Sequence, residues 1–398
     1  MTGTQTQPIW LDGDFISDPQ RQYAVLRSEH PVARVTMPQG HSFWLVTRYE
    51  DVRAALTDPA LHKNGRVYEA MIGQTEPGSP AALDEHMLSA DPPDHTRLRK
   101  LVSKAFTARA IAALRPRIEE IAADLLDAME KGPNTVDLLD AFAFPLPITV
   151  ICELLGVPNV DRDEFRKWSN TLLQAGSSVD QQAAAQAMAG YLAALVEQKL
   201  ANPADDVLSA IVQATENADR LSGSEAVAMA FLLLVAGHET TVNLIGNGTL
   251  ALLGDPDQLA ELTADPALAP GAVEELLRYN GPINMATFRF TAEATTIGGI
   301  EIPAGQMVLV SLAAANRDPD HYPEADRVDL RRAASHLAFG HGIHYCLGAP
   351  LARLEGEIAF TRLFERFPGL ALDADPAELT WRPSTLLRGL ERLPVRLR

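Results

Sequence analysis

The chain has 398 residues, of which 46% are apolar and 22% are charged, and its formal net charge is −18. A strongly acidic chain stays soluble and does not favour nonspecific binding to nucleic acid. It has only two cysteines, no signal-like segment and no apolar run near the ~20 residues of a membrane span. We therefore expect a cytoplasmic protein that binds neither nucleic acid nor membrane.

The periodicity of the chain predicts a mainly α protein with small β-sheets. Two β-branched and aromatic runs, residues 31–37 and 43–47, flank Pro38-Gln39-Gly40 and predict a hairpin. The segment 62–90 holds scattered Gly and Pro without a clear pattern, which is typical of a functional or mobile segment. Helical periodicity then dominates at 108–129, 138–155, 162–174, 182–200 and 206–215.

The string Asp91-Pro92-Pro93-Asp94-His95-Thr96-Arg97-Leu98-Arg99 predicts the start of a helix, with Asp94 as its cap. His95 and Arg99 lie four positions apart and therefore share one face of that helix. Two donors at this spacing suit the binding of one anion. An exposed polar face would have the same pattern.

A capping box, Ser222-Gly223-Ser224-Glu225, opens a long helix that is apolar on nearly all faces, which predicts burial at the centre of the protein. Inside this helix, Ala236 and Gly237 remove side-chain bulk next to Glu239 and Thr240. An unpaired buried carboxylate is costly, so we expect Glu239 to face water or a polar partner. The arrangement indicates a site, although Thr240 can instead bond back to the carbonyl group four residues earlier.

One of the two cysteines lies in Phe339-Gly340-His341-Gly342-Ile343-His344-Tyr345-Cys346-Leu347-Gly348, directly before a helical pattern. Free N–H groups and the dipole at a helix start stabilise a thiolate, which makes Cys346 a candidate axial ligand. Gly342 and Gly348 leave room for a flat cofactor against the backbone, and Phe339 would wall it. The alternatives are a buried cysteine in a Gly-rich turn and a zinc site formed with His336, His341 and His344.

Four motifs, in this order along the chain, resemble the cytochrome P450 monooxygenases. They are the helix-start string with His95, A-G-x-E-T-T at 236–241, E-x-x-R from Glu275 to Arg278, and F-x-x-G-x-x-x-C-x-G ending at Gly348. Because the motifs are spread along the chain, the resemblance implies one P450 domain over residues 1–398. The implied fold is a triangular helical prism with haem between the long central helix and the helix after the cysteine loop.

The resemblance also implies the cofactor, haem b, with Cys346 as its thiolate ligand. The haem propionates would bind His95, Arg99, Arg289 and His344, although many family members have Arg at the last of these positions. The other residues implied to contact the haem are Phe339, Gly342, Ala236, Gly237 and Gly348.

The same resemblance assigns roles to two pairs of polar residues. Glu239 and Thr240 would manage the protons that cleavage of the O–O bond requires. Glu275 and Arg278 would have a structural role, since the family uses this pair to brace the cysteine loop, with Arg327 as a possible third member.

The segments that form the substrate pocket in this family are mostly uncharged here. They predict a bulky, largely apolar substrate of the macrolide, polyketide or steroid-like kind that the soluble bacterial class of natural-product-tailoring enzymes uses. Asn284 is a polar exception that either orients a substrate group or bonds backbone in a turn. Residues 65–80 and Ala175-Gly176-Ser177-Ser178 predict a lid. The expected pocket residues are Val67, Met71, Met87, Leu88, Leu172, Val235, Ile283, Asn284, Leu386 and Leu387.

The predicted reaction inserts one oxygen atom from O2 into a C–H bond or a double bond. No G-x-G-x-x-G fingerprint is visible and two cysteines are too few for an iron–sulfur cluster, so we expect electrons from a ferredoxin and a ferredoxin reductase. We expect a monomer whose docking face for an acidic ferredoxin comprises Arg97, Lys100, Lys104, Arg353 and Arg362. The alternative is a haem-thiolate peroxygenase or a non-oxygenating enzyme, which would not need Glu239 and Thr240.

Overall fold

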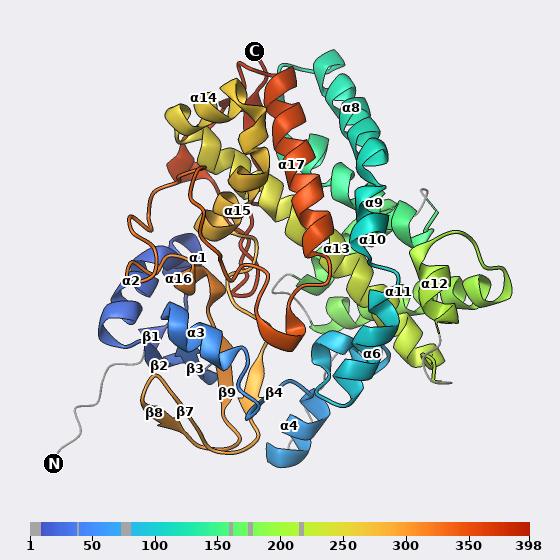
Figure 1. Cartoon of the computed structure of the whole chain (residues 1–398), viewed down its shortest axis with the longest axis vertical. Helices are drawn as coiled ribbons and strands as arrows, with labels where there is room; N and C mark the ends of the chain where they lie inside the picture. The colour runs from blue at the N-terminus through green and yellow to red at the C-terminus, as the bar shows by residue number, and fades with distance from the viewer. Residues whose placement is uncertain (1–8, 38–39, 73–80, 159–161, 174–177, 215–218) are drawn as a thin grey trace.

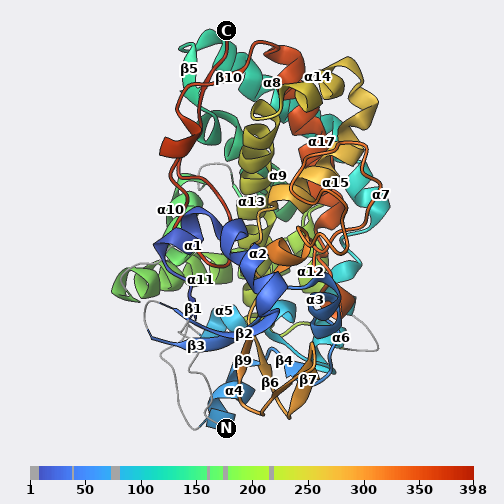
Figure 2. The same ribbon diagram turned by 90° about the vertical axis from the view of Figure 1, so that its left-hand side faces the viewer.

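The computed structural model describes residues 9–37, 40–72, 81–158, 162–173, 178–214 and 219–398. Helices make up most of it, and the larger sheet gathers at the end of the molecule opposite the C-terminus (Figure 1, Figure 2). The predicted mainly α fold with small sheets is therefore confirmed. The helices are α1 (Gly13–Ser17), α2 (Pro19–Glu29), α3 (Tyr49–Ala55), α4 (Gly65–Ile72), α5 (Ala81–Asp84), α6 (Asp94–Ser103), α7 (Ala108–Ala112), α8 (Arg115–Lys131), α9 (Pro145–Leu155), α10 (Arg162–Leu173), α11 (Ser178–Ala201), α12 (Val207–Gln213), α13 (Gly223–Leu253), α14 (Pro256–Ala264), α15 (Ala269–Asn280), α16 (Leu312–Ala315) and α17 (Ala349–Arg366).

The strands form three sheets among the described residues. The largest has the order β1 (Ile9–Trp10), β2 (Val32–Thr36), β3 (Ser42–Val46), β9 (Met307–Val310), β6 (Arg289–Thr291) and β4 (Leu61–His62). A second joins β10 (Ala371–Leu372), β11 (Pro394–Arg396) and β5 (Thr135–Asp137), and the third pairs β7 (Thr295–Ile297) with β8 (Ile300–Ile302).

The large sheet connects distant parts of the chain. Its β2–β3 pair is the predicted antiparallel hairpin, and β9 adds to β3 in parallel. On the far side of β9, β6 pairs in antiparallel register, which places Arg289 opposite Val308. A strand residue with paired neighbours has a fixed direction, so the sheet holds Arg289 in place.

Several predicted boundaries were wrong, and prolines explain most of the errors. The expected helix 108–129 is split into α7 and α8, because Pro116 lies in the first turn of a new helix. The expected helix 138–155 begins as a π-helical turn and continues as α9 from Pro145. Asp94 is the first residue of α6 rather than its cap. Segment 62–90 contains α4 and α5, while residues 73–80 and 175–177 of the predicted lid lie outside the described residues.

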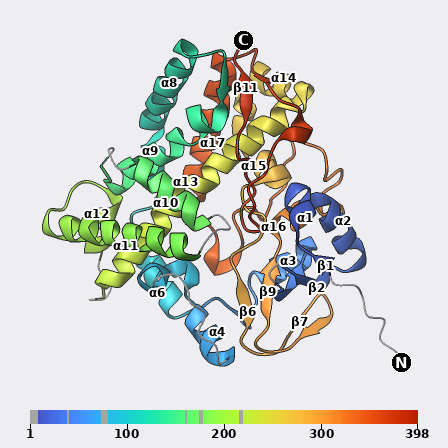
Figure 3. The ribbon, with the colours of Figure 1, turned by 180° about the vertical axis from the view of Figure 1, so that it is seen from behind.

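The helix α13 passes through the middle of the molecule and packs against α9, α11, α15 and α17 (Figure 3). Its predicted capping box is present, since the backbone N–H of Glu225 donates to Ser222 Oγ at 3.1 Å and Ser222 N–H donates back to Glu225 Oε2 at 2.8 Å. The helix is long and apolar enough to cross a membrane, but 72% of its most apolar stretch is buried inside the protein. It is therefore the buried core helix that the sequence predicts.

Small residues let the neighbours of α13 approach closely. A Cβ atom added at Gly248 would collide with the ring of Phe360 on α17, and one added at Gly246 would lie 2.7 Å from Leu139. The contact of Gly248 with Phe360 sets how closely α13 approaches the helix that follows the cysteine loop.

Candidate active site

The cysteine loop ends where α17 begins. The N–H of Cys346 donates to the carbonyl oxygen of Phe339 at 2.9 Å, which closes the loop. Solvent reaches the residue, yet the protein atoms around the sulfur raise the pKa of the Cys346 thiol. The backbone N–H groups of Gly348 and Ala349 and the charge of Arg99 oppose that rise, because they stabilise the thiolate.

The glycines of this loop have different roles. A Cβ atom at Gly348 would meet only Cys346 Sγ, at 3.9 Å, so space is open beside the sulfur. Gly342 has a φ of 73°, and a Cβ atom there would lie 2.8 Å from Thr57 Cγ2. The missing side chain of Gly342 therefore makes room for Thr57 and not, as expected, for a cofactor. Its positive φ permits a left-handed turn.

The four predicted anion-binding residues come together from three parts of the fold. His95 and Arg99 lie on α6, Arg289 on β6 and His344 in the cysteine loop. The rings of His95 and His344 have centroids 4.3 Å apart, and Arg99 donates to the carbonyl oxygen of Tyr345 at 2.6 Å. The two α6 side chains therefore share the face that their spacing predicts, because both reach the cysteine loop.

These groups carry an excess of positive charge. Burial, followed by the charges of Lys63, His95 and the two arginines, lowers the pKa of His344 to about 2. Burial lowers the pKa of Arg289 to about 10. Within the described part of the chain, neither ring nitrogen of His95 nor Nε of Arg289 has a hydrogen-bond partner. Unpaired buried donors around one point fit a ligand with carboxylates, such as the two propionates of haem.

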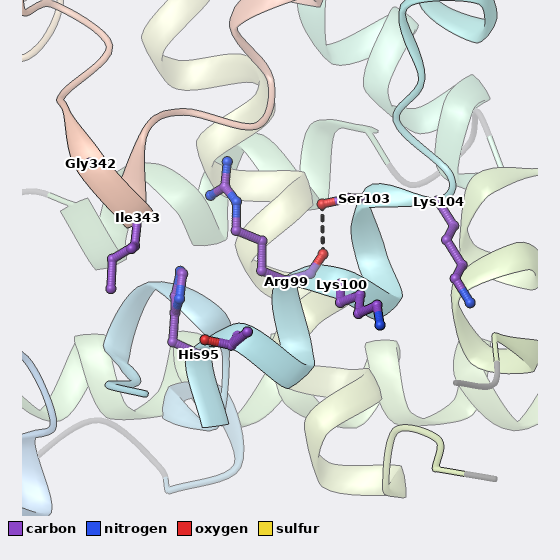
Figure 4. A pocket seen from close by; sticks show the side chains of 8 residues that line it. His95, Arg99, Lys100, Ser103, Lys104, Gly342 and Ile343 are labelled. Carbon is purple, nitrogen blue, oxygen red and sulfur yellow. Dashed lines mark hydrogen bonds between the residues drawn. The ribbon is translucent and has the colours of Figure 1, made fainter. Parts of the chain in front are cut away.

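A cavity of about 630 Å3 opens between α6 and the cysteine loop (Figure 4). His95, Arg99 and Lys100 reach it from α6, and Gly342 and Ile343 reach it from the loop. The cavity therefore extends the positive cluster to the surface.

The acid and alcohol of α13 have defined partners. Glu239 is 2% exposed and accepts a hydrogen bond from Arg382 Nη1 at 3.0 Å, while His238 Nε2 lies 3.5 Å from its other oxygen. Burial alone would raise the pKa of Glu239, but His238 and Arg382 outweigh it, so the pKa is lowered. This confirms the expectation of a polar partner. Thr240 Oγ1 donates to the carbonyl oxygen of Ala236 at 2.9 Å, as the alternative interpretation states.

The two small residues of α13 do not act alike. Ala236 is exposed although the helix is buried around it, so space opens on its side. A Cβ atom at Gly237 would lie 2.9 Å from two carbon atoms of Ile151 on α9. The missing side chain of Gly237 therefore makes room for α9 and not, as expected, for a cofactor.

Glu275 and Arg278 form a buried pair with two hydrogen bonds of 2.7 Å. Arg278 also donates to the carbonyl oxygen of Asn316 at 2.9 Å, and the side-chain oxygen of Asn316 accepts from the N–H of Leu337 at 2.8 Å. These bonds lead from α15 to the residues just before the cysteine loop. The side chain that joins the pair is Arg332, 3.1 Å from Glu275, and not that of the expected Arg327. Arg327 takes part only through its carbonyl oxygen, which accepts from Arg278 at 2.9 Å.

The comparisons with known proteins agree with this geometry. The family model described as cytochrome P450 matches residues 9–182 and 264–384. The chain belongs to the cytochrome P450 family. Members of this family are oxidoreductases that carry haem b with a cysteine thiolate ligand.

Similar P450 enzymes cover nearly the whole chain. The cytochrome P450 monooxygenase PikC of Streptomyces venezuelae is 50% identical over 100% of this chain and 96% of its own. Vitamin D(3) 25-hydroxylase of Pseudonocardia autotrophica is 51% identical over 99% of this chain and 97% of its own. The structure of the tirandamycin C-bound P450 monooxygenase TamI has a TM-score of 0.92 and 50% identity, covering 98% of this chain and 100% of that one.

These findings bear on the alternatives. The predicted family and cofactor are confirmed. Among the described residues, no group of three or more His, Cys, Asp and Glu side chains is arranged to hold a metal ion, so the zinc alternative has no geometric support.

The predicted pocket residues occupy several environments. Val67 and Met71 lie on α4 with 46% and 41% of their surfaces exposed, and Ile283 pairs with Leu387 in a short bridge. The buried side chain of Asn284 accepts a hydrogen bond from Tyr23 Oη at 3.1 Å through its oxygen. Met87 and Val235 are buried, and Leu88, Leu172 and Leu386 are half-buried. Phe339 lies half-buried beneath the guanidinium of Arg353, 4.5 Å from its ring centroid.

Three residues of the predicted basic docking face form ion pairs inside the chain. Arg97 pairs with Glu225, Arg353 with Glu274, and Arg362 with Glu365. Ion pairs inside the chain reduce the charge that a partner meets. Lys100 and Lys104 line the cavity beside Arg99 and the half-exposed Ile343.

Sequence reasoning missed two residues, Arg382 and Lys63. Arg382 lies 143 positions from Glu239, and Lys63 follows β4 in a segment without clear periodicity. A lone basic residue in the sequence does not indicate its partner in the fold. Only the structure shows that Arg382 contacts Glu239 and that Lys63 contacts Thr287.

The Arg382–Glu239 pair makes a prediction about stability. Arg382→Met leaves a buried carboxylate without its guanidinium and should lower the free energy of unfolding at pH 7 by about 2–3 kcal/mol. Because the folded pKa of Glu239 is lowered, this contribution is present above the ordinary carboxyl pKa and is lost as pH falls through the lowered one. Urea unfolding of the haem-loaded protein measures the loss.

A double-mutant cycle supplies the control. Adding Glu239→Gln to Arg382→Met should recover most of the loss, since no buried charge then remains. Arg327→Met, at a largely exposed ion pair with Glu324, should change the free energy by less than about 1 kcal/mol. If the double variant loses as much stability as Arg382→Met and Glu239→Gln together, the two side chains are not coupled.

Proposed function

We propose that this P450 binds haem through Cys346 and inserts one oxygen atom from O2 into a bulky, largely apolar small molecule. The observation that carries this proposal is an accessible cysteine at the start of α17 beside a cluster of basic side chains, in which His95 and Arg289 have buried nitrogens without hydrogen-bond partners. The haem supplies the chemistry of O2 activation. The chain supplies the thiolate, the anchors for the propionates, a dry pocket and a route for protons.

Cys346 has the features that a thiolate ligand needs. Two N–H groups from the first turn of α17 and the charge of Arg99 favour the deprotonated sulfur. The other cysteine, Cys152, is buried in the apolar core of α9. We therefore propose Cys346 as the iron ligand, with His95, Arg99, Arg289 and His344 as the residues that bind the propionates.

Glu239 and Thr240 are proposed to manage protons. Glu239 is held as a carboxylate by Arg382 and His238, and it adjoins Thr240 at the place where Ala236 leaves open space. A carboxylate with a lowered pKa beside a hydroxyl group can pass a proton when it releases one of its partners. A peroxygenase would have no need for this pair.

Thr240→Ala tests that role. The variant should bind haem and substrate normally but divert most reducing equivalents to hydrogen peroxide, because the hydroxyl group that directs the proton is gone. The measurement compares NADPH consumed, product formed and peroxide released, using a surrogate ferredoxin and reductase. Thr241→Ala, at the neighbouring buried hydroxyl, is the control. Unchanged coupling in Thr240→Ala would remove the role.

The substrate class rests on the apolar lining and on the relatives. Val235 and Met87 are apolar and buried, and Ile283, Leu386 and Leu172 are half-buried. TamI binds tirandamycin C, and the relative from Pseudonocardia autotrophica is a vitamin D(3) hydroxylase. We propose a macrolide, polyketide or steroid-like substrate for this chain, with natural-product tailoring as its setting.

A titration series tests the substrate class. Macrocycles and steroids should shift the haem Soret band, whereas small polar acids should not. Ala236→Leu fills the space beside Thr240 and should weaken this shift at least about tenfold, or about 1.4 kcal/mol. Ala187→Leu, on the exposed face of α11, should leave it unchanged. Tight shifts with small polar acids alone would overturn the apolar-pocket proposal.

The remaining proposals concern partners and setting. We propose a cytoplasmic monomer that forms one domain and receives electrons from an acidic ferredoxin at the surface around Lys100, Lys104 and Ile343. Opposite charges would attract the two proteins, and added salt would screen that attraction. The rate of reduction should therefore fall as ionic strength rises. A rate of reduction that ignores ionic strength would count against this docking face.

A further inference from the structure

Lys63 is a buried cation without a carboxylate partner. It follows β4 and is only 3% exposed. Its ammonium group donates to Thr287 Oγ1 at 2.6 Å. Across the described chain no acidic side chain lies within ion-pair distance of it, so this three-donor group has one hydrogen-bond partner.

The nearest carboxylate is occupied elsewhere. Both oxygens of Asp91 accept from the backbone N–H of Lys63 at 3.1 Å, and one also accepts from the N–H of Asn64. Asp91 thus fixes the backbone at Lys63 and leaves the ammonium group directed elsewhere. A side chain whose backbone is held in this way has a fixed direction, which is typical of a binding residue.

The surroundings of Lys63 are positive. Burial lowers the pKa of Lys63 well below its ordinary value, and the charge of Arg289 lowers it further against the opposing effect of Asp91. In turn, Lys63 lowers the pKa of both His344 and His95. Three formal cations, Lys63, Arg99 and Arg289, therefore share one region. Buried charges of one sign are tolerated when an anion compensates them.

We propose that Lys63 binds a haem propionate directly, as a fifth member of the group formed by His95, Arg99, Arg289 and His344. This inference rests on the proposed haem site but adds a residue that none of the four sequence motifs contains. Two propionates would supply the negative charge that compensates these three cations. Because an ammonium is a compact point charge, it can approach a carboxylate oxygen beside the broader guanidinium of Arg289.

The test is the rate at which ferric haem transfers to an excess of apomyoglobin. Lys63→Met should raise this rate at least about tenfold, because one charge-assisted hydrogen bond to the haem is lost. Lys63→Arg keeps the charge and should stay near the parent rate. Lys131→Met, at an exposed position at the end of α8, should leave the rate unchanged.

Thr287→Val separates propionate binding from a merely structural role. It removes the hydroxyl group that accepts from the ammonium group but keeps the charge, so we expect less than about a threefold change. A Thr287→Val rate as fast as that of Lys63→Met, or a Lys63→Met rate equal to the parent rate, would overturn the proposal. If Lys63→Met does not accumulate, Lys63→Gln takes its place in the same assay.

A second probe tells the haem carboxylates from other anions. Parent apoprotein should bind haem much more tightly than haem dimethyl ester, and Lys63→Met should reduce that preference. If Lys63→Met leaves the preference for haem over its dimethyl ester unchanged but weakens the binding of a fatty acid, Lys63 binds a substrate carboxylate. That result would contradict the proposal. Neither result changes the thiolate spectrum of the haem. The proposed function therefore does not depend on whether Lys63 binds a propionate.

Discussion

The architecture depends on gathering buried positive charge around one place. Arg99 comes from α6, Arg289 from β6, and Lys63 from the residues after β4, with His95 and His344 beside them. Bringing such groups together without an anion is unfavourable. The six-stranded sheet and α6 hold these groups in place despite the repulsion between them. The two negative charges of the haem propionates would turn that repulsion into attraction.

The cysteine loop depends on a second constraint, the buried pair of Glu275 and Arg278. Arg278 bonds to the carbonyl oxygen of Asn316, and Asn316 bonds to the N–H of Leu337. Two residues later, Phe339 accepts the N–H of Cys346. Hydrogen bonds and short stretches of backbone therefore connect α15 to the proposed iron ligand. This connection explains how a residue pair on a distant helix can position the sulfur.

Local patterns predicted the residues whose role depends on spacing along the chain. His95 and Arg99 share a helical face, and Cys346 precedes a helix start, so both could be found without the fold. Partners that meet across the fold could not. The contacts of Glu239 with Arg382 and of Asn284 with Tyr23 join residues 143 and 261 positions apart. Gly237 and Gly342 were misjudged for the same reason, since a glycine does not reveal whether its missing side chain makes room for a cofactor or for Ile151 and Thr57.

The central claim is that Cys346 is the thiolate ligand of the haem iron. The most direct measurement is the absorption spectrum of the reduced, carbon monoxide-bound protein for the parent, Cys346→Ala and Cys152→Ala. The account predicts the thiolate-type band in the parent and in Cys152→Ala, and its loss in Cys346→Ala. A normal thiolate band in Cys346→Ala would contradict it.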